Sequence, residues 1–216
     1  MLRILAKCFE ALPEKGDLIE DRWIMNSFLK RFSMLDLVVI ALTSALGIGI
    51  KPIIVPLIHI VTGPLYIPGG AAAGGFYMLW IVLGIGITRK IGTGTLIGLI
   101  QALLVIITGA YGTHGAISII TYTLPGIITD VAAKVLGNRF LTPAGFFILG
   151  LIANIAGTFL SSMVFFRLPL IPLLLSLSAA SLSGGLGGLI AYKIMRELCK
   201  SGVINTIDGQ GDTNEK

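Results

Sequence analysis

A small set of polar and aromatic residues interrupts long apolar stretches of this sequence and offers the chemistry of non-covalent binding. Lys51 carries an ammonium group that can bind an anionic or carbonyl group of a ligand, or can extend to lipid headgroups. Imidazole and phenol rings can stack on a flat heterocycle and hydrogen-bond to it, although tyrosines also gather where membrane meets water. The side chains that we expect to bind a ligand are Lys51, Tyr66, Trp80, Tyr111, His114, Tyr122 and Asn154.

Two amides lie near the middle of apolar segments, where each needs a partner from a neighbouring helix or from a ligand. We expect Asn154 to face the ligand and Gln101 to be structural. Trp80, with Tyr77 close by, can form a stacking wall or pack in the core or against lipid. His59 either lines the first loop or faces headgroups.

The sequence holds no arrangement for covalent catalysis. It lacks the HExxH and GxSxG patterns and paired catalytic carboxylates, and it has only two histidines. The glycine-rich stretch 183–188 lacks the Lys-Ser/Thr pair of a phosphate-binding loop. We therefore expect no enzymatic activity, no cofactor and no metal site.

The composition indicates that a membrane surrounds these residues. Of the 216 residues 55% are hydrophobic and 12% are charged, whereas a soluble domain has about 25% charged residues. The net charge is +5, but the basic residues lie between apolar runs, so they indicate topology and not a nucleic-acid partner. Six apolar segments approach or exceed the roughly 20 residues that cross a bilayer: 35–61, 70–88, 91–111, 115–136, 143–166 and 168–194. We predict an all-α integral membrane protein with six transmembrane helices.

The basic residues predict the orientation of these segments. Of the 16 lysines and arginines, only Lys51 and Arg167 fall on the outer side of the six-helix arrangement. Because positive charge collects on the cytoplasmic side of membrane proteins, both termini are expected inside the cell.

Three regions follow from this pattern. Residues 1–34 form a cytoplasmic arm with apolar residues at helical spacing, either an amphipathic helix on the inner membrane surface or a docking arm for a partner. Residues 35–198 form the transmembrane substrate-binding domain. Residues 199–216 are polar, and we expect a disordered cytoplasmic tail.

Prolines interrupt the first apolar segment. Pro52 and Pro56 predict a break near 51–56, because proline removes a backbone donor and restricts the residue before it. Non-helical backbone within a membrane must line a cavity or be covered by protein. Residues 51–69 are therefore a candidate functional loop.

A spacing of four residues recurs in several segments and brings side chains to one helix face. Small residues with this spacing let helices approach closely, and we predict that they pack the bundle internally: Ser176, Ala180, Gly184 and Gly188 in the last segment, and Gly94, Gly98 and Ala102 in the third. Asp130 and Lys134 share the spacing, and we expect an ion pair between them.

Taken together, these features resemble the S components of energy-coupling factor (ECF) transporters, membrane subunits that capture vitamins or their precursors. The resemblance covers about residues 35–198 and includes the AxxxA pair Ala41 and Ala45 in the first span and a glycine-rich last span. The stretches Gly69-Gly70, Phe76 to Trp80, Arg89-Lys90, Gly109 to Gly112 and Pro125 to Asp130 are most similar to the thiamine-precursor (hydroxymethylpyrimidine) branch. The cobalt- and nickel-specific branch is less similar, because its metal ligands begin at the N-terminus, where this chain has no histidine.

The resemblance implies a substrate-capture subunit in a prokaryotic cell membrane, which binds its solute in the outer half of the bundle under a cap after the first span. It also implies a transmembrane coupling subunit, against which Ala41 and Ala45 pack, and two cytoplasmic ATPase subunits. The chain departs from the family in its long arm and in having few acidic groups to meet a cationic pyrimidine or thiazolium. A self-sufficient secondary transporter and a non-transporting membrane scaffold are the alternatives.

Overall fold

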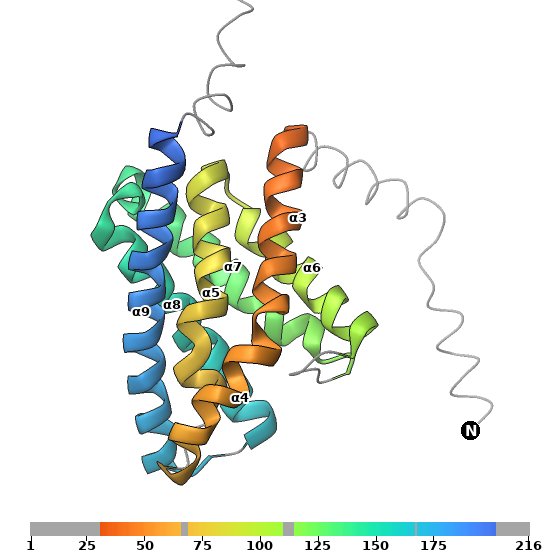
Figure 1. Cartoon of the computed structure of the whole chain (residues 1–216), viewed down its shortest axis with the longest axis vertical. Helices are drawn as coiled ribbons and strands as arrows, with labels where there is room; N and C mark the ends of the chain where they lie inside the picture. Colours follow the sequence, from red (N-terminus) through yellow and green to blue (C-terminus); the bar gives the residue numbers. More distant parts are fainter. Residues whose placement is uncertain (1–30, 66–68, 110–114, 167, 202–216) are drawn as a thin grey trace, which may run out of the picture. The chain divides into compact units, whose positions relative to one another are not determined.

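The structure, a computed structural model, describes residues 31–65, 69–109, 115–166 and 168–201 (Figure 1). The chain divides into two compact units, Met1–Leu37 and Val38–Lys216. Residues 1–30 of the expected arm and 202–216 of the expected tail lie outside the described residues. The described part is helical and contains no β-strand, which confirms the all-α prediction for it.

The helices lie over the six predicted apolar segments. Their bounds are α3 (Met34–Gly49), α4 (Lys51–Thr62), α5 (Gly69–Thr88), α6 (Thr93–Thr108), α7 (Ser118–Leu136), α8 (Pro143–Ser161) and α9 (Leu170–Lys200). Short 3-10 turns η1 (Gly63–Leu65) and η2 (Gly137–Leu141) follow α4 and α7, and a π-helical turn η3 (Ser162–Phe166) follows α8.

Five helical stretches are long and apolar enough to cross a membrane: Met34–Thr62, Gly69–Thr88, Gly115–Leu141, Pro143–Phe165 and Leu170–Lys200. The helix in the third predicted segment, α6, is shorter. Its 16 residues reach about 24 Å at 1.5 Å per residue, against a hydrocarbon core of about 30 Å. The structure thus supports a multi-pass membrane protein with five candidate spans, and the sixth span stays a prediction.

The first span is interrupted at Ile50, directly before the predicted 51–56, and the residues that follow are not a loop. Helix α3 ends at Gly49, and α4 begins at Lys51, with Pro52 in its first turn. A proline is tolerated there because the first N–H groups of a helix have no intrahelical partner. The expectation that 51–69 is non-helical is therefore wrong for Lys51–Thr62, which continues as a helix past Pro56.

Glycines set the distance between the central helices. Helix α5 packs against α9, and α9 also packs against α8 (Figure 1). A methyl group on Gly187 would overlap the backbone of Gly75, and one on Gly150 would overlap that of Gly184. The hydroxyl of Ser183 on α9 donates to the carbonyl of Ala72 and accepts from the N–H of Gly75, both on α5. The small-residue ladder of the last segment therefore packs the bundle internally, as predicted.

Helices α6 and α7 are joined by the same kind of contact and by one carboxylate. A Cβ on Gly126 would overlap the carbonyl of Gly94. Asp130 is 4% exposed, and its carboxylate accepts from the N–H groups of Gly94 and Thr95 at 3.0 and 2.8 Å. Helix α6 starts after Gly92, which has no side chain to cap it, so Asp130 of α7 satisfies its first donors. The predicted ion pair is wrong: in the described part of the chain Asp130 binds α6, and Lys134 is exposed.

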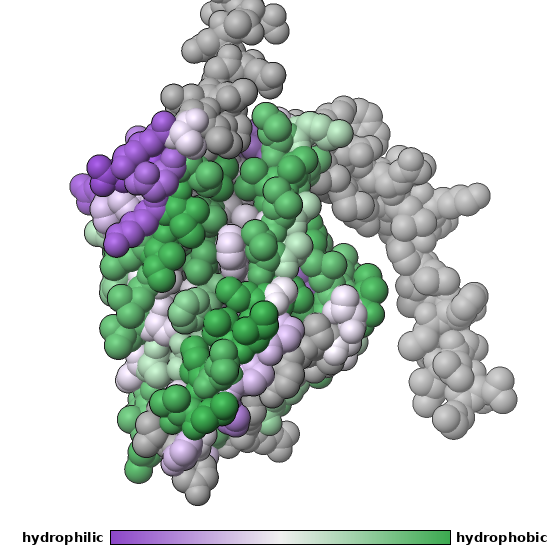
Figure 2. All heavy atoms as spheres, in the orientation of Figure 1, coloured by the Kyte–Doolittle hydropathy of each residue, from purple (hydrophilic) through white to green (hydrophobic). Residues whose placement is uncertain are grey.

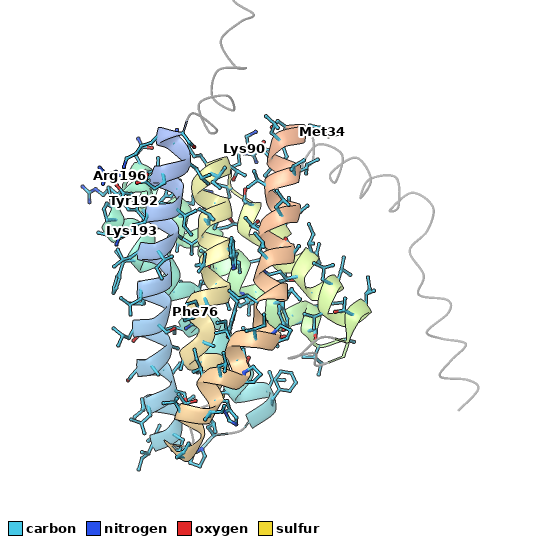
Figure 3. All side chains as sticks on the ribbon, viewed as in Figure 1. Met34, Phe76, Lys90, Tyr192, Lys193 and Arg196 are labelled. Atoms are coloured by element: carbon cyan, nitrogen blue, oxygen red, sulfur yellow. The ribbon has the colours of Figure 1, made fainter. Side chains whose placement is uncertain are left out.

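On the face shown in Figure 2, the described residues are mostly hydrophobic, and hydrophilic residues gather near the C-terminal end of α9. Large apolar side chains are exposed on several helices, among them Leu42 on α3, Val131 on α7 and Leu182 on α9. Lys90, Lys193 and Arg196 lie at one end of the helices, whereas Phe76 lies near the middle of α5 (Figure 3). An apolar girdle with charge at one end is the surface that a bilayer requires.

Candidate functional site

A cavity of about 300 Å³ lies among α4, α5, α6, α7 and the end of α8. Its volume is at the small end of the range for small-molecule sites. Apolar residues and glycines line part of it. The polar residues that line it are Lys51, His59, Tyr77, Gln101, Thr121, Tyr122, Thr158, Ser161 and Ser162. Such a lining of ammonium, phenol, amide and hydroxyl groups can bind a small ring compound by stacking and hydrogen bonds.

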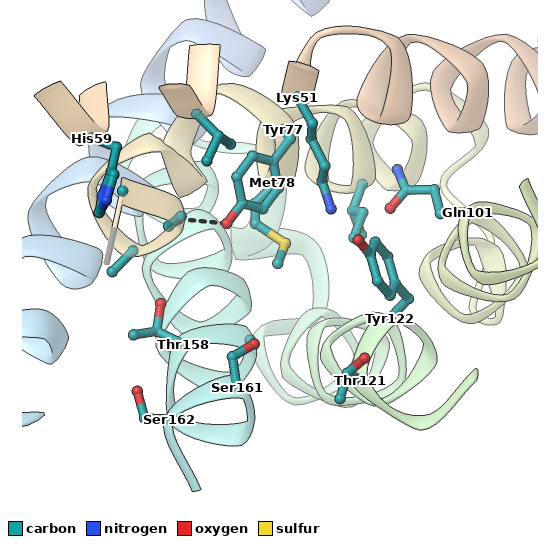
Figure 4. Close-up of a pocket in the computed structure, with 16 residues that line it drawn as sticks. Lys51, His59, Tyr77, Met78, Gln101, Thr121, Tyr122, Thr158, Ser161 and Ser162 are labelled. Carbon is teal, nitrogen blue, oxygen red and sulfur yellow. Dashed lines mark hydrogen bonds between the residues drawn. The ribbon is translucent and has the colours of Figure 1, made fainter. Parts of the chain in front are cut away.

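Lys51 provides the basic group of this cavity. It is the first residue of α4 and is only 8% exposed. Its Nζ lies 4.4 Å from the ring centroid of Tyr77 on α5 and 4.0 Å from that of Tyr122 on α7 (Figure 4). A desolvated cation over an aromatic face gains about 2 kcal/mol or more. Of the two alternatives for Lys51, the structure therefore supports the cavity and not the headgroups.

Tyr77 is held in place by its own helix. Its hydroxyl donates a short hydrogen bond to the carbonyl of Gly70, near the start of α5 (Figure 4). Gly69 allows this end of α5 to meet α4, because a Cβ there would lie 2.8 Å from the Cβ of His59 and 2.9 Å from the carbonyl of Val55. Close packing of α4 on α5 thus determines the positions at which the side chains of His59, Lys51 and Tyr77 enter the cavity lining.

The two amides have the opposite placement from the one expected. Asn154 is fully buried, and its Nδ2 donates to the carbonyls of Ala71 at 3.1 Å and Ala180 at 2.8 Å. It joins α8 to α5 and α9 and does not line the cavity. Gln101, expected to be structural, is 3% exposed and lines the cavity. Both residues lie near the middle of their apolar segments. The rotation of each helix about its axis decides which of the two side chains faces the cavity.

The other expected ligand-binding residues are not brought together in the described structure. Trp80 does not line the cavity, and its buried Nε1 has no hydrogen-bond partner among the described residues. Tyr66, Tyr111 and His114 lie outside the described residues. Of the seven predicted residues, Lys51 and Tyr122 meet in the cavity.

Sequence reasoning missed most of the hydroxyl groups in the lining. Thr158, Ser161 and Ser162 lie at the end of α8, and Thr121 precedes Tyr122 on α7. Serine and threonine hydroxyls in helices commonly bond to the backbone of the preceding turn, so their presence in an apolar segment carries little signal. The position of Tyr77 could be predicted more easily. It lies seven residues after Gly70, and this spacing places both residues on the same side of α5.

Ala41 and Ala45, the expected partner-binding residues, are exposed on α3. Leu42 and Leu46 are exposed beside them, with 57% and 48% of their surface accessible. This face of α3 is accessible to lipid or to another protein.

A comparison with protein families gives one match, over residues 35–156, to a model described as the ABC-type cobalt transport system, permease component. No curated protein and no solved structure matches the chain. The match covers α3 to most of α8, and therefore most of the elements that form the cavity. Its description names cobalt, the branch that the sequence resembles less. Because more than half of the 216 residues match, the chain belongs to the family of ABC-type cobalt transport system permease components.

Proposed function

We propose that this chain is the substrate-capture (S) subunit of an ECF-type ABC importer and binds a vitamin or vitamin precursor, similar to thiamine or hydroxymethylpyrimidine. The observation that carries the proposal is the cavity in which Lys51 lies between the rings of Tyr77 and Tyr122. Two tyrosine side chains, a buried donor and the amide of Gln101 are groups that recognise a small heteroaromatic ring. The absence of a catalytic pattern from the sequence supports capture without chemistry.

The cavity favours an organic solute over a cobalt ion. Cobalt binds best to several imidazole, thiolate or carboxylate ligands. Among the residues that the structure describes, the cavity contributes one imidazole, His59, and a lysine that repels cations. No group of three or more histidine, cysteine or acidic residues is assembled in that part of the chain.

Transport then depends on partner subunits, as the family description of a permease component implies. We propose a transmembrane coupling subunit and two cytoplasmic ATPase subunits as these partners. Small residues such as Ala41 and Ala45 let a partner helix approach closely, and both are exposed on α3.

The proposed topology has six spans with both termini in the cytoplasm, and the basic residues support it. Lys90, Lys193 and Arg196 share one end of the helices (Figure 3). Gly70, which lines the cavity, precedes Thr88 at the other end of α5 by 18 residues, or about 27 Å along the helix, and Lys90 follows two residues later. If the basic end is cytoplasmic, the cavity lies toward the outer side.

Mass spectrometry of small molecules released from the purified, detergent-solubilised protein tests this function. We expect a thiamine-related pyrimidine or another vitamin in near-stoichiometric amount. Binding of hydroxymethylpyrimidine and of Co²⁺ by calorimetry follows, with Tyr122→Ala as a cavity variant and Ile120→Ala, on an exposed part of the same helix, as its control. The cavity variant should lose at least tenfold in affinity, and the control should not.

Other outcomes would favour the alternative functions. Uptake of a solute into liposomes by this chain alone would support a secondary transporter. A protein that contains no organic solute and binds none from a vitamin panel would support a scaffold, and tight binding of Co²⁺ alone would support a metal-capture subunit.

A further inference from the structure

We infer that the cavity selects its solute by charge: it takes an uncharged or anionic heteroaromatic solute that presents an acceptor group to Lys51, and it disfavours solutes with a permanent positive charge. The acceptor can be a carboxylate, a phosphate, a carbonyl or a ring nitrogen. This inference rests on the proposed function and names the kind of solute that the same site takes. Within the proposed class, it favours the pyrimidine precursor over thiamine, which carries a thiazolium cation.

The first step is that no carboxylate lines the cavity to balance Lys51. None of the lining residues is acidic. The sequence from Val38 to Arg196 contains a single carboxylate, that of Asp130. The connecting segments 66–68, 110–114 and 167, whose structure is not described, also have no acidic residue in their sequence. A counter-charge from this part of the chain can therefore come only from Asp130.

The second step is that both carboxylate oxygens of Asp130 already accept hydrogen bonds from α6. One oxygen accepts from the N–H of Gly94 at 3.0 Å, and the other accepts from the N–H and the hydroxyl of Thr95 at 2.8 and 2.7 Å. Asp130 also lies eight residues beyond Tyr122, or about 12 Å along α7. Its charge is satisfied at the start of α6 and does not reach the ammonium of Lys51.

The third step concerns the aromatic faces. Besides the uncharged amide and hydroxyl oxygens of the lining, tyrosine rings are groups of the cavity that could attract a cationic solute. The rings of Tyr77 and Tyr122 already face the Nζ of Lys51, at 4.4 and 4.0 Å from their centroids. A second cation in a cavity of about 300 Å³ would compete for these faces and be repelled by Lys51.

An acceptor on the solute has the opposite effect. Burial removes water from an ammonium group, and a hydrogen bond to an acceptor restores the interaction that is lost. Lys51 is 8% exposed and points between the two rings, with Gln101 beside it (Figure 4). The structure therefore assigns Lys51 as the residue that determines charge specificity.

Three pyrimidine probes of different charge test the inference on the purified full-length protein in detergent: hydroxymethylpyrimidine, its phosphate ester and thiamine. Calorimetry should give at least tenfold tighter binding of the first two than of thiamine. Lys51→Met keeps an unbranched side chain that is one heavy atom shorter and removes its charge. This variant should lose at least tenfold in affinity for the phosphate ester, so that the affinities for the phosphate ester and for thiamine become more alike. If the cavity rejected thiamine because of its size, removing the charge of Lys51 would not bring the two affinities closer. Lys51→Arg, as the matched control, should keep the wild-type order of the three affinities.

The wild-type protein decides the question even if Lys51→Met fails to fold, because equal or tighter binding of thiamine would overturn the inference. An unchanged difference in affinity between the phosphate ester and thiamine in folded Lys51→Met would also overturn it. In both cases the proposed function survives, since a pyrimidine still binds. If none of the probes binds and no organic solute co-purifies, the proposed function fails and the inference fails with it.

Discussion

The carboxylate of Asp130 on α7 accepts hydrogen bonds from both the backbone N–H and the hydroxyl of Thr95, which lies 35 positions earlier at the start of α6. A side chain from another helix thus accepts the hydrogen bond that an N-cap residue of α6 would normally accept. Close contact between Gly94 and Gly126 brings the two helices near enough for it. The contact sets the register of α6 against α7, and α6 carries Gln101 into the cavity while α7 carries Tyr122.

Replacement of Asp130 by leucine should destabilise the protein. The buried donors of Gly94 and Thr95 would lose their acceptor, at a cost of about 1–3 kcal/mol. Asp130→Asn keeps an acceptor and should cost less. Thermal unfolding in detergent measures both. Lys134→Ala is the control and should leave the midpoint unchanged. An equal decrease in the unfolding midpoint of Lys134→Ala would support the ion pair between Asp130 and Lys134, which the described structure lacks.

Asn154→Ala should lower stability and leave the selectivity for solutes intact. Its amide donates two hydrogen bonds that tie α8 to α5 and α9, and such bonds between membrane helices contribute about 0.6–1.7 kcal/mol each. Thermal unfolding and calorimetry with hydroxymethylpyrimidine separate the two effects. Ile148→Ala, on an exposed part of α8, is the control. If folded Asn154→Ala lost solute binding and kept its unfolding midpoint, Asn154 would belong to the ligand site.

Gly75→Ala should prevent tight packing of α5 on α9. The added methyl group would overlap the backbone carbonyl of Ser183, and overpacking of this kind costs about 1–3 kcal/mol. The yield of monodisperse protein in size-exclusion chromatography should fall. Gly49→Ala is a matched control, because a Cβ at Gly49 meets no atom within 4 Å. Equal yields from the two variants would contradict the contact between α5 and α9.

Ala41→Leu combined with Ala45→Leu should abolish association with the proposed coupling subunit and leave solute binding intact. Both positions are exposed on α3, and larger side chains there would hold a partner helix away. Co-purification with the coupling and ATPase subunits measures association. Val131→Phe, an enlargement of comparable size on an exposed part of α7, should have no effect. If the double variant still co-purifies with its partners, the interface lies elsewhere.

The sequence alone determined the features that depend on local composition. The lengths of the apolar segments placed the helices, because a helix must be long enough to cross the bilayer. The prolines predicted a break near 51–56, and the helix is interrupted directly before Lys51, because proline restricts the backbone close to it. The four-residue spacing of Gly184 and Gly188 predicted their burial between helices, because that spacing selects one helix face whichever helix packs against it.

Only the tertiary structure decided which polar groups meet. Gln101 and Asn154 have the same chemistry and a similar depth, yet one lines the cavity and the other bridges helices. Asp130 has a basic residue one turn away and binds a distant helix end instead. Lys51, Tyr77 and Tyr122 come from three helices and converge within about 4 Å. The rotation of each helix about its axis controls these outcomes, and contacts between residues far apart in the chain, such as Gly94 with Gly126, set that rotation.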